Sequence, residues 1–334
     1  MKKRKSRNDD CVERKQINVL FTSVSHKVSL VNSFRNAYRD LKIPGLIVGV
    51  DCDPFSAAFH FVDKKYVIPR LDDRNFLPKL MSICRRENIA LLIPTRDEDL
   101  SFFSNHRHEF EANNIRVMVA DPRTIAICSD KWRFFKYLQN NRISTIETWQ
   151  RLDPKIKFPC IVKPRMGKGA LGVLKIEDMT QLRGVDLDKN IIQEKIEGVE
   201  YTIDYLADFD GRPVCAVPRI RLRIYQGESK AGVTKYDKKM IDLCKKLGKG
   251  LKLIGHNTIQ CFKLPDGKIK FLEVNPRFGG GAALGMAAGC KSPEFILSLM
   301  ANRVFPIVEK FTEDLAMIRY SQDIFLPYDQ IGGF

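Results

Sequence analysis

Apolar and polar positions between residues 17 and 120 follow two alternating periods, which predicts repeated strand and helix units. Short apolar runs of strand length occupy residues 17–22, 45–50, 89–93 and 115–119. Stretches with helical periodicity separate them, at about 27–41, 76–87 and 100–113. Because strands that alternate with helices form parallel sheets with right-handed crossovers, we expect a Rossmann-like α/β domain over residues 17–120.

Beyond residue 120 this regular alternation ends. A helix is expected over about 130–140, where large apolar residues fall on one face. Residues 190–204 have the pattern of two strands separated by a Glu-Gly break, which is typical of a link between two sheets. We therefore expect linker helices and an α+β lid over residues 121–204, and an antiparallel sheet completed by residues 205–334.

A predicted hairpin at residues 257–274 carries three oxygen-donor side chains. Its strands are joined by Pro265-Asp266-Gly267, a sequence that favours a tight turn. Period-two alternation places Glu273 and Asn275 on one strand face, and strand pairing brings Gln260 beside them. Carboxylate and amide oxygens suit Mg²⁺ held beside substrate phosphates. The hairpin thus predicts a metal and nucleotide site.

Arg277 lies just beyond these donors, where it can neutralise a phosphoryl group. The alternative is a buried strand that ends in a Pro-Arg turn, with Glu273 paired to Arg277. The segment alone leaves both interpretations open.

A second phosphate-type element lies about a hundred residues upstream. Lys163 ends a predicted strand, and a glycine-rich loop follows it at once. Glycines let backbone N–H groups approach an anion, and basic residues add charge, here Gly167, Gly169, Gly172, Arg165 and Lys168. The segment matches neither the Walker pattern nor the dinucleotide fingerprint. A hairpin with a glycine turn is the alternative, but it leaves the density of basic residues unexplained.

The break within residues 190–204 offers polar groups for a base and a sugar. The backbone of Glu194, Lys195 and Ile196 is expected to pair with an adenine, and Glu200 to accept hydrogen bonds from ribose hydroxyls. An ordinary strand bend with solvated glutamates is the alternative.

Residues 218–224 alternate strictly between basic and apolar side chains. This pattern predicts one basic strand face and one face toward the core, namely Arg219, Arg221 and Arg223 against Ile220, Leu222 and Ile224. Adjacent guanidiniums repel unless anions lie between them, so we interpret the basic face as a docking site for a γ-phosphate and a substrate carboxylate. A solvated face partly paired to Glu228 or Asp208 is the alternative.

A triple-glycine loop at residues 279–281 precedes a small-residue helix at 282–288. The first amides of this helix are candidates for holding an oxyanion in a second reaction step. Tight packing of the backbone on the sheet explains the glycines equally well.

The first strand of the chain is followed by residues 23–27, which lack the glycines of a dinucleotide-binding loop. Asp51 after the second strand is compatible with a ribose contact, but without those glycines a dehydrogenase is a weak interpretation. We interpret His26 as a solvated loop residue.

The order of these elements resembles the ATP-grasp superfamily, most closely its carbamoyl phosphate synthase-like branch, which includes the pyrrolysine biosynthesis ligase. The resemblance covers roughly residues 17–325, and the motifs of the family fall on Lys131, Lys163, residues 167–172, residues 194–200, Gln260, Glu273, Asn275 and Arg277. It implies an α+β fold in which two antiparallel sheets enclose ATP, preceded by a domain that acts as a lid and partner surface. Relatives usually have Gly-Arg where Ser25 and His26 stand, so this loop inherits no role.

The resemblance also implies a reaction. An ATP-dependent ligase would activate a carboxylic acid as an acyl phosphate and transfer it to an amine, and two Mg²⁺ ions, or Mn²⁺ in their place, would bind Gln260, Glu273 and Asn275. Catalytic roles are expected for Lys163, Arg221, Arg223 and Arg277. Nucleotide contacts are expected for Lys131, Lys163, Gly167, Lys168, Gly169, Gly172, Glu194, Lys195, Ile196 and Glu200. The alternatives are phosphorylation of bicarbonate or carbamate, as in carbamoyl phosphate synthase, and a non-catalytic ATP-binding regulator.

Composition fits a cytoplasmic enzyme, and the resemblance implies ATP and small-molecule acid and amine substrates as its partners. The 334 residues include nine scattered cysteines without a Cys-x-x-Cys motif and no apolar run of the roughly 18 residues that span a membrane. We expect reduced buried thiols, no zinc site, no membrane contact and a disordered basic leader over residues 1–16. The net charge of +16 comes without a basic stripe interleaved with aromatic residues, which argues against a nucleic-acid partner. A homodimer is left open.

Overall fold

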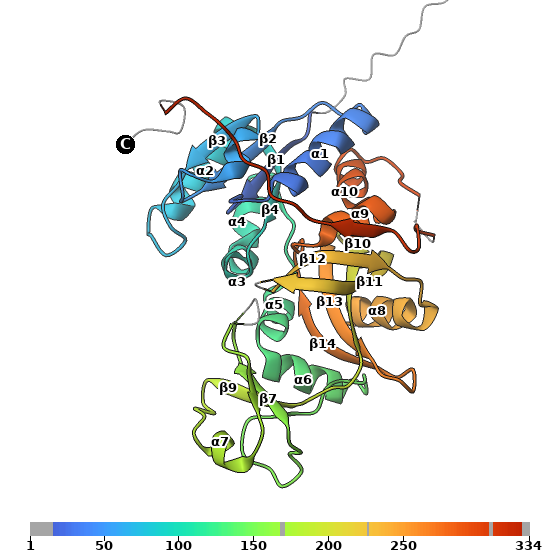
Figure 1. Cartoon of the computed structure of the whole chain (residues 1–334). Helices are drawn as coiled ribbons and strands as arrows, with labels where there is room; N and C mark the ends of the chain where they lie inside the picture. The colour runs from blue at the N-terminus through green and yellow to red at the C-terminus, as the bar shows by residue number, and fades with distance from the viewer. Residues whose placement is uncertain (1–15, 168–170, 226, 307–309, 329–334) are drawn as a thin grey trace, which may run out of the picture.

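The computed structural model of the chain describes residues 16–167, 171–225, 227–306 and 310–328. It contains a parallel sheet, a six-stranded antiparallel sheet and a four-stranded antiparallel sheet, which follow one another from top to bottom in Figure 1. Residues 1–15 of the expected leader, and Lys168 and Gly169 of the glycine loop, lie outside the described residues.

Five parallel strands in the order β3-β2-β1-β4-β5 form the N-terminal sheet, as the alternating pattern predicted. Its elements are β1 (Asn18–Thr22), α1 (Val28–Leu41), β2 (Ile47–Asp51), the 3-10 helix η1 (Ala57–His60), β3 (Lys64–Val67), α2 (Phe76–Arg86), β4 (Ile89–Pro94), α3 (Asp97–Asn105), α4 (Arg107–Glu111) and β5 (Arg116–Val117). The helix expected over 100–113 is two helices, because the backbone leaves the helical region at His106. The edge strand β3 was not predicted, since its largely exposed side chains carry no apolar signal.

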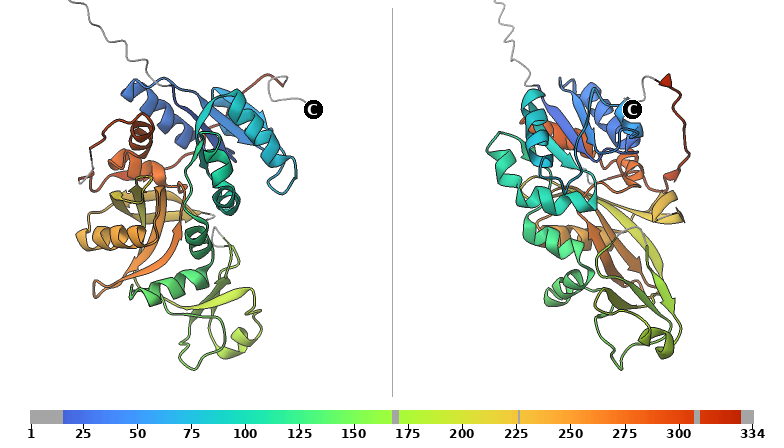
Figure 2. Two further views of the ribbon diagram at one scale, coloured as in Figure 1. Left: turned by 180° about the vertical axis from the view of Figure 1, so that it is seen from behind. Right: turned by 90° about the vertical axis from the view of Figure 1, so that its left-hand side faces the viewer.

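The N-terminal sheet and the C-terminal part of the chain share one apolar core. This core joins Phe21 of β1 and Phe34 of α1 to Phe278 and Ile296. The Phe34 ring lies 5.0 Å from that of Phe21 and 6.0 Å from that of Phe278, in edge-on contacts. Helix α1 lies beside α10 (Ser292–Met300), as both Figure 1 and Figure 2 show. This packing fixes the first domain against the larger sheet.

The six-stranded sheet has the order β14-β13-β10-β11-β12-β15 and is covered on both faces. Its strands and helices are β10 (Val199–Ala207), β11 (Pro213–Tyr225), β12 (Glu228–Thr234), α8 (Lys238–Gly250), β13 (Gly255–Lys263), β14 (Ile269–Asn275), α9 (Ala282–Ala288) and β15 (Ala316–Ile318). On one face Tyr205 packs against Met240 and Leu247 of α8. On the other face Leu206 packs against Phe295 of α10. The predicted hairpin of β13 and β14 is confirmed.

The four-stranded sheet has the order β6-β9-β7-β8 and coincides with the expected lid, a name kept below for this sheet and α7. Its elements are β6 (Thr148–Trp149), β7 (Cys160–Pro164), β8 (Leu174–Ile176), α7 (Met179–Arg183) and β9 (Asn190–Glu194), and α5 (Pro122–Ser129) and α6 (Lys131–Asn140) precede it. Val162 and Ile192 build its small core with Leu182 of α7. Because β9 belongs to the lid and β10 to the larger sheet, the segment between them links two sheets, as predicted.

The described residues also show the state of the cysteines and the character of the helices. The eight cysteines in the described part of the chain are free thiols, and six of them are buried. Cys52 is exposed, contrary to the expectation, because it lies in the turn that follows β2. Within the described ranges, no helix has the length and apolar character needed to cross a bilayer.

Candidate functional site

Lys163 lies near the end of β7 with only 7% of its surface exposed. Burial lowers the pKa of its ammonium group to about 8, while the Glu273 and Glu200 carboxylates of the large sheet act in the opposite direction. Its ammonium has no hydrogen-bond partner among the residues that the structure describes. A buried cation in this situation is costly unless an anion joins it. The position therefore favours binding of an anion between the lid and the large sheet.

Lys131, the first residue of α6, lies next to Lys163 and holds the start of the glycine loop. Its ammonium donates a hydrogen bond to the carbonyl oxygen of Gly167 at 2.9 Å. Burial lowers its pKa, and the nearby Glu273 carboxylate opposes that change. The helix start is fixed by Asp130, which accepts from the backbone amide of Trp132 and from the guanidinium of Arg165 at 2.6 Å. Lid and α6 are thus joined beside the two lysines.

The described ends of the glycine loop need glycine for different reasons. Gly167 and Gly172 have φ angles of +145° and +71°, which other residues rarely adopt. A Cβ atom on Gly172 would also lie 2.9 Å from Cγ of Pro164. The structure thus gives a conformational reason for the glycines on both sides of residues 168–170.

The three expected oxygen donors come together at the end of the hairpin. Gln260 of β13 pairs directly with Glu273 of β14, so both side chains lie on one sheet face. Asn275, two residues along the same strand, donates from its amide to Glu273 at 3.1 Å. Of the neighbouring carboxylates, Glu273 does most to raise the pKa values of Lys131 and Lys163 against the effect of burial. Glu273 therefore lies close enough to the two lysines for its charge to act on both, with Gln260 and Asn275 beside it.

Glu194 at the end of β9 is already engaged within the protein. Its backbone amide donates to the carbonyl of Glu147 at 3.0 Å, and its carboxylate accepts from the Glu147 amide at 2.9 Å and from Lys270. Lys195 and Ile196 follow the strand and lie in the link between the two sheets. Contact of residues 194–196 with a base therefore stays a prediction. Lys195 and Ile196 are better candidates for it than Glu194, whose backbone amide and carboxylate are already hydrogen-bonded.

Arg277 contacts the first domain instead of Glu273. Its guanidinium donates two hydrogen bonds to the Asp97 carboxylate, at 2.8 and 2.6 Å, and a third to the carbonyl of Phe278. The alternative in which Glu273 pairs with Arg277 is therefore wrong. Asp97 begins α3 at the end of β4, so this ion pair joins the parallel sheet to the hairpin of the large sheet.

The arginines of β11 do not form the continuous basic face that the alternation predicted. Arg219 is buried and pairs with Asp204 at 2.8 Å. Arg221 donates to Glu200 at 2.8 Å and to the carbonyl of Gly227 at 2.5 Å, and Arg223 is exposed. Neither of the expected partners, Glu228 and Asp208, contacts these guanidiniums.

The backbone explains this correction. The β11–β12 pairing shifts register on both sides of Arg223, which interrupts period-two alternation. The strand end also extends beyond the packed part of the sheet, so Leu222 and Ile224 are 62% and 45% exposed and do not face the core. Only Ile220, before the first shift, packs against the core as predicted.

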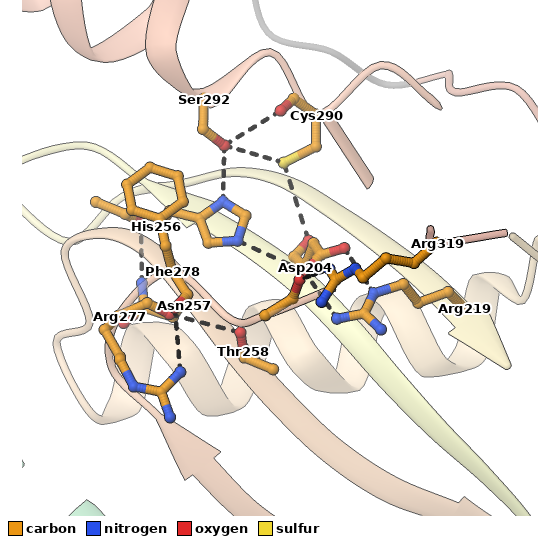
Figure 3. A network of polar contacts seen from close by, with 12 residues as sticks. Asp204, Arg219, His256, Asn257, Thr258, Arg277, Phe278, Cys290, Ser292 and Arg319 are labelled. Carbon is orange, nitrogen blue, oxygen red and sulfur yellow. Dashed lines mark hydrogen bonds and ion pairs between the residues drawn. The ribbon is translucent and has the colours of Figure 1, made fainter. Parts of the chain in front are cut away.

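A buried polar network joins Asp204, Arg219, His256 and Ser292 (Figure 3). The Asp204 carboxylate lies 3.5 Å from Nε2 of His256, whose Nδ1 is 2.8 Å from the hydroxyl of Ser292. The imidazole ring stacks on Phe278 with 4.4 Å between centroids. Burial raises the pKa of Asp204, but Arg219 and His256 together hold it below its usual range. The carboxylate is therefore ionised, and Arg219 is its hydrogen-bonded partner, because Nε2 of His256 makes no hydrogen bond within the described ranges.

The triple-glycine loop and α9 pack directly on this network. A Cβ atom on Gly281 would lie 2.7 Å from a guanidinium nitrogen of Arg219, and one on Gly285 would lie 2.2 Å from an Asp204 oxygen. Gly279 approaches the Thr258 hydroxyl in the same way, at 2.5 Å. The glycines thus serve close packing on the sheet, the second of the two explanations that the sequence allowed.

Sequence reasoning missed the contribution of the first domain to this region. Asp97, which binds Arg277, and Lys27, which precedes α1, both belong to that domain and lie near the end of the hairpin. Neither residue belongs to a local motif. Their position in the chain could have identified them, because Asp97 and Lys27 follow the carboxyl ends of two neighbouring parallel strands, β4 and β1.

Comparisons with known proteins agree with this architecture. A family model described as an ATP-grasp domain matches residues 128–281, and one described as a PylC-like N-terminal domain matches residues 19–118. The D-alanine–D-alanine ligase of Aquifex aeolicus (strain VF5) is 28% identical over 155 residues, which are 42% of this chain. The match covers 53% of the ligase, so the chain spans about half the length of that relative.

Several solved structures have the same fold at low sequence identity. The biotin carboxylase of Campylobacter jejuni, in a complex with β,γ-ATP, superposes with a TM-score of 0.70 at 13% identity, covering 89% of this chain and 74% of its own. The N5-carboxyaminoimidazole ribonucleotide synthetase of Thermotoga maritima gives 0.65 at 16% identity, with 88% and 78% covered. The L-amino acid ligase of Bacillus licheniformis gives 0.65 at 16% identity, with 87% and 75% covered. These similarities establish a common fold.

Proposed function

The chain belongs to the ATP-grasp superfamily, and from this premise we propose that it is an ATP-dependent carboxylate–amine ligase. The observation that carries the proposal is the convergence of Lys131 and Lys163 on Glu273 across the space between the two antiparallel sheets. Two partly or fully buried cations opposite a set of oxygen donors match a polyphosphate and its divalent cations. The D-alanine–D-alanine ligase similarity supports the same class of reaction.

The donor set fits magnesium. Gln260, Glu273 and Asn275 present only oxygen atoms and amide groups, without the sulfur or imidazole ligands that favour zinc or copper. In this proposal these residues hold two Mg²⁺ ions, or Mn²⁺ in their place, and the ions neutralise charge on the phosphates. Asn275 would turn its amide oxygen toward the metal and release its hydrogen bond to Glu273.

The protein's own side chains position the nucleotide. Lys131 and Lys163 supply hydrogen bonds to the phosphates from α6 and β7, and the backbone amides of Gly167 and Gly172 are available beside them. The link at 194–196 contacts the adenine, and Glu200, held by Arg221, accepts from the ribose hydroxyls. ATP then lies between the lid and the large sheet.

The proposed reaction has two steps and needs no protein nucleophile. An oxygen of the acid's carboxylate attacks the γ-phosphorus of ATP, the bond to the β-phosphate oxygen breaks, and an acyl phosphate and ADP result. The amine then attacks the acyl carbon, phosphate leaves, and the amine's proton passes to solvent or phosphate. Lys163, Arg221, Arg223 and Arg277 contribute by positioning groups and neutralising charge. Arg277 first has to share or release Asp97 to do so.

A screen for ADP formation tests this proposal. The protein is incubated with Mg-ATP and pools of carboxylates and amines, and the product of an active pool is identified by mass spectrometry. We expect ADP formation that requires both an acid and an amine. Release of ADP with bicarbonate alone would instead indicate carbamoyl phosphate synthase-like chemistry, and tight ATP binding without turnover in any pool would indicate a regulator.

Replacing Lys163 with methionine should separate nucleotide binding from stability. We expect the affinity for a non-hydrolysable ATP analogue to fall about tenfold or more, because a charge-assisted contact to phosphate is lost. Without nucleotide, the variant should be more stable by about 2 kcal/mol, because the cost of burying the ammonium disappears. Lys189→Met, at a side chain 85% exposed on the same lid, is the control and should change neither quantity.

The pH dependence of this stability gain follows from the lowered pKa of Lys163. Between its folded pKa of about 8 and the 10.5 of an ordinary lysine, the unfolded chain binds more protons than the folded protein. The cost of the buried ammonium is therefore fully present below pH 8 and fades as the pH rises toward 10.5. Melting curves of wild type and Lys163→Met should converge over this range, and a constant difference would contradict the assignment.

The two arginines near the end of β11 should behave differently. Arg223→Ala is expected to raise KM for the acid roughly tenfold, while affinity for the ATP analogue stays within about threefold, if Arg223 binds the substrate carboxylate. Arg221→Ala should raise KM for the acid and also lower the affinity for the ATP analogue, because Glu200 loses the guanidinium that orients it. Kinetics with the acid from the screen and calorimetric titration with the analogue measure these effects. Wild-type kinetics for Arg223→Ala would remove Arg223 from the substrate site.

A further inference from the structure

A cavity of about 800 Å³ lies between α6 and the lid. Figure 1 shows α6 beside the lid sheet, and the cavity is enclosed by α6 on one side and by β6, the loop after it and the link at residues 194–197 on the other. Its volume lies within the range of small-molecule sites. Neither Lys163 nor Glu273 is among the described residues that line it. The cavity is therefore separate from the proposed phosphate and metal contacts, although it shares Glu194 and Lys195 with the proposed base contact.

Aromatic side chains from both walls line this cavity. Trp132 of α6, Trp149 of β6 and Phe158 in the loop after β6 are each partly exposed. Trp149 and Phe158 also pack against the lid core, which holds their rings in place. An indole N–H can only donate, and within the described residues neither tryptophan has a hydrogen-bond partner for it. The walls thus offer aromatic ring faces and two free donors.

The charged side chains around the cavity nearly cancel. Four lysines and four acids line it, namely Lys136, Lys155, Lys157, Lys195, Glu147, Asp153, Glu194 and Glu197. Lys270, which is not part of the lining, pairs with Glu194 and so leaves one positive charge in excess. This small excess matches a monovalent anion. A nucleotide or another polyphosphate would bring more negative charge than the cavity can neutralise.

Several of these charges have no partner in the described part of the chain. The ammonium groups of Lys155, Lys157 and Lys195 make no hydrogen bond or ion pair, and neither do the carboxylates of Glu147 and Glu197. Both glutamates flank the strand pair of β6 and β9, whereas two of the three lysines lie in the loop after β6. That loop is therefore the part of the wall that favours an anion.

We infer that this cavity binds an aromatic compound that carries a single carboxylate. Its ring contacts Trp132 and Trp149, and its carboxylate accepts hydrogen bonds from Lys155 and Lys157. The ligand contacts α6 and the lid at once, so it fixes their relative position from outside the reaction centre. The site is additional to the nucleotide and substrate sites, and the inference does not depend on the ligase proposal.

Intrinsic fluorescence tests this site directly, because Trp132 and Trp149 are the only two tryptophans of the chain. The full chain, with Mg²⁺ and a saturating non-hydrolysable ATP analogue, is titrated with 4-nitrobenzoate, an aromatic monocarboxylate whose nitro group quenches indole emission. Free N-acetyltryptophanamide corrects for light absorbed by the probe. We expect saturable quenching with a Kd of about 1 mM or lower.

Two probes with the same ring test the assigned charge. Neutral 4-nitrobenzyl alcohol should bind at least about tenfold more weakly than 4-nitrobenzoate, because it forms no charge-assisted hydrogen bonds. Dianionic 4-nitrophenyl phosphate should bind no more tightly than 4-nitrobenzoate, because the cavity has one positive charge in excess. Tighter binding of the dianion by tenfold or more would identify a phosphate site and overturn the inference.

Variants test the two parts of the wall separately. Lys155→Gln combined with Lys157→Gln should lower the affinity for 4-nitrobenzoate at least about tenfold, and both positions are exposed, so the fold should be kept. Trp132→Ala should lower it about tenfold, with Trp149 still reporting the binding. Lys189→Gln, at an exposed lid position outside the cavity, is the control and should match the wild type. Melting curves establish that each variant is folded.

Three results would overturn the inference. The first is quenching of the wild type that does not saturate, which would show only collisions with exposed rings. The second is a double lysine variant that binds 4-nitrobenzoate as tightly as the wild type. The third is an apparent Kd that rises in proportion to the concentration of the ATP analogue, which would place the probe in the nucleotide site.

Discussion

Glu273→Gln is expected to lower the rate of ADP formation by at least about a hundredfold while the protein stays folded. Glu273 is the carboxylate that faces both Lys131 and Lys163, and it pairs with Gln260 across the hairpin. Glutamine keeps the shape of the side chain but removes the charge that holds divalent cations beside the phosphates. Loss of one such preorganised group typically costs about 3 kcal/mol in the barrier.

The measurement is steady-state ADP formation at saturating Mg²⁺, with circular dichroism to establish folding. Glu177→Gln is a suitable control, because this lid glutamate is 53% exposed and pairs with Lys175 on the same strand edge of the lid. The control should keep wild-type activity. Near-normal turnover by Glu273→Gln would exclude Glu273 from the mechanism.

Arg219→Ala is expected to destabilise the folded protein by about 3–5 kcal/mol. The substitution leaves Asp204 ionised and without its guanidinium at a position that is 0% exposed. It also removes the surface on which Gly281 packs. His256, at 3.5 Å, compensates only in part.

Chemical denaturation of wild type, Arg219→Ala and Arg223→Ala measures this effect. Arg223 is a matched control on the same strand, because its side chain is exposed and its loss should change stability by less than about 0.5 kcal/mol. Replacing both members of the pair, as in Asp204→Leu with Arg219→Met, should recover part of the loss, because no unpaired charge remains. Equal stability of the two single variants would show that the buried pair contributes nothing.

The sequence predicted the parts of the site that depend on local periodicity. Glu273 and Asn275 share a strand face because they lie two residues apart in β14. Gln260 pairs with Glu273 only after the register shifts by one residue between Gln260 and Cys261, a shift that the Pro265-Asp266-Gly267 turn does not predict. Lys163 lies near a strand end as expected. For Lys163, and for Glu273 with Asn275, a single strand contains the information that the prediction needs.

The parts that the sequence did not predict depend on contacts between distant elements. Arg277 and Asp97 are 180 positions apart, so no pattern links them. In the sequence, Arg219 has the same alternating surroundings as Arg221 and Arg223. Arg219 lies in the covered part of β11 and forms a buried ion pair, whereas Arg223 lies near the strand end and is exposed. The register shifts around Arg223 likewise arise from pairing with β12, because a bulge depends on both strands.

The most direct test of the ligase proposal is the fate of a labelled oxygen. The acid returned by the screen is prepared with ¹⁸O in its carboxylate and incubated with ATP, Mg²⁺ and the amine, and the released phosphate is analysed by mass spectrometry. Because the carboxylate oxygen attacks the γ-phosphorus and leaves with it, each phosphate should carry one labelled oxygen. Product formation with unlabelled phosphate would contradict an acyl phosphate and, with it, the proposed mechanism.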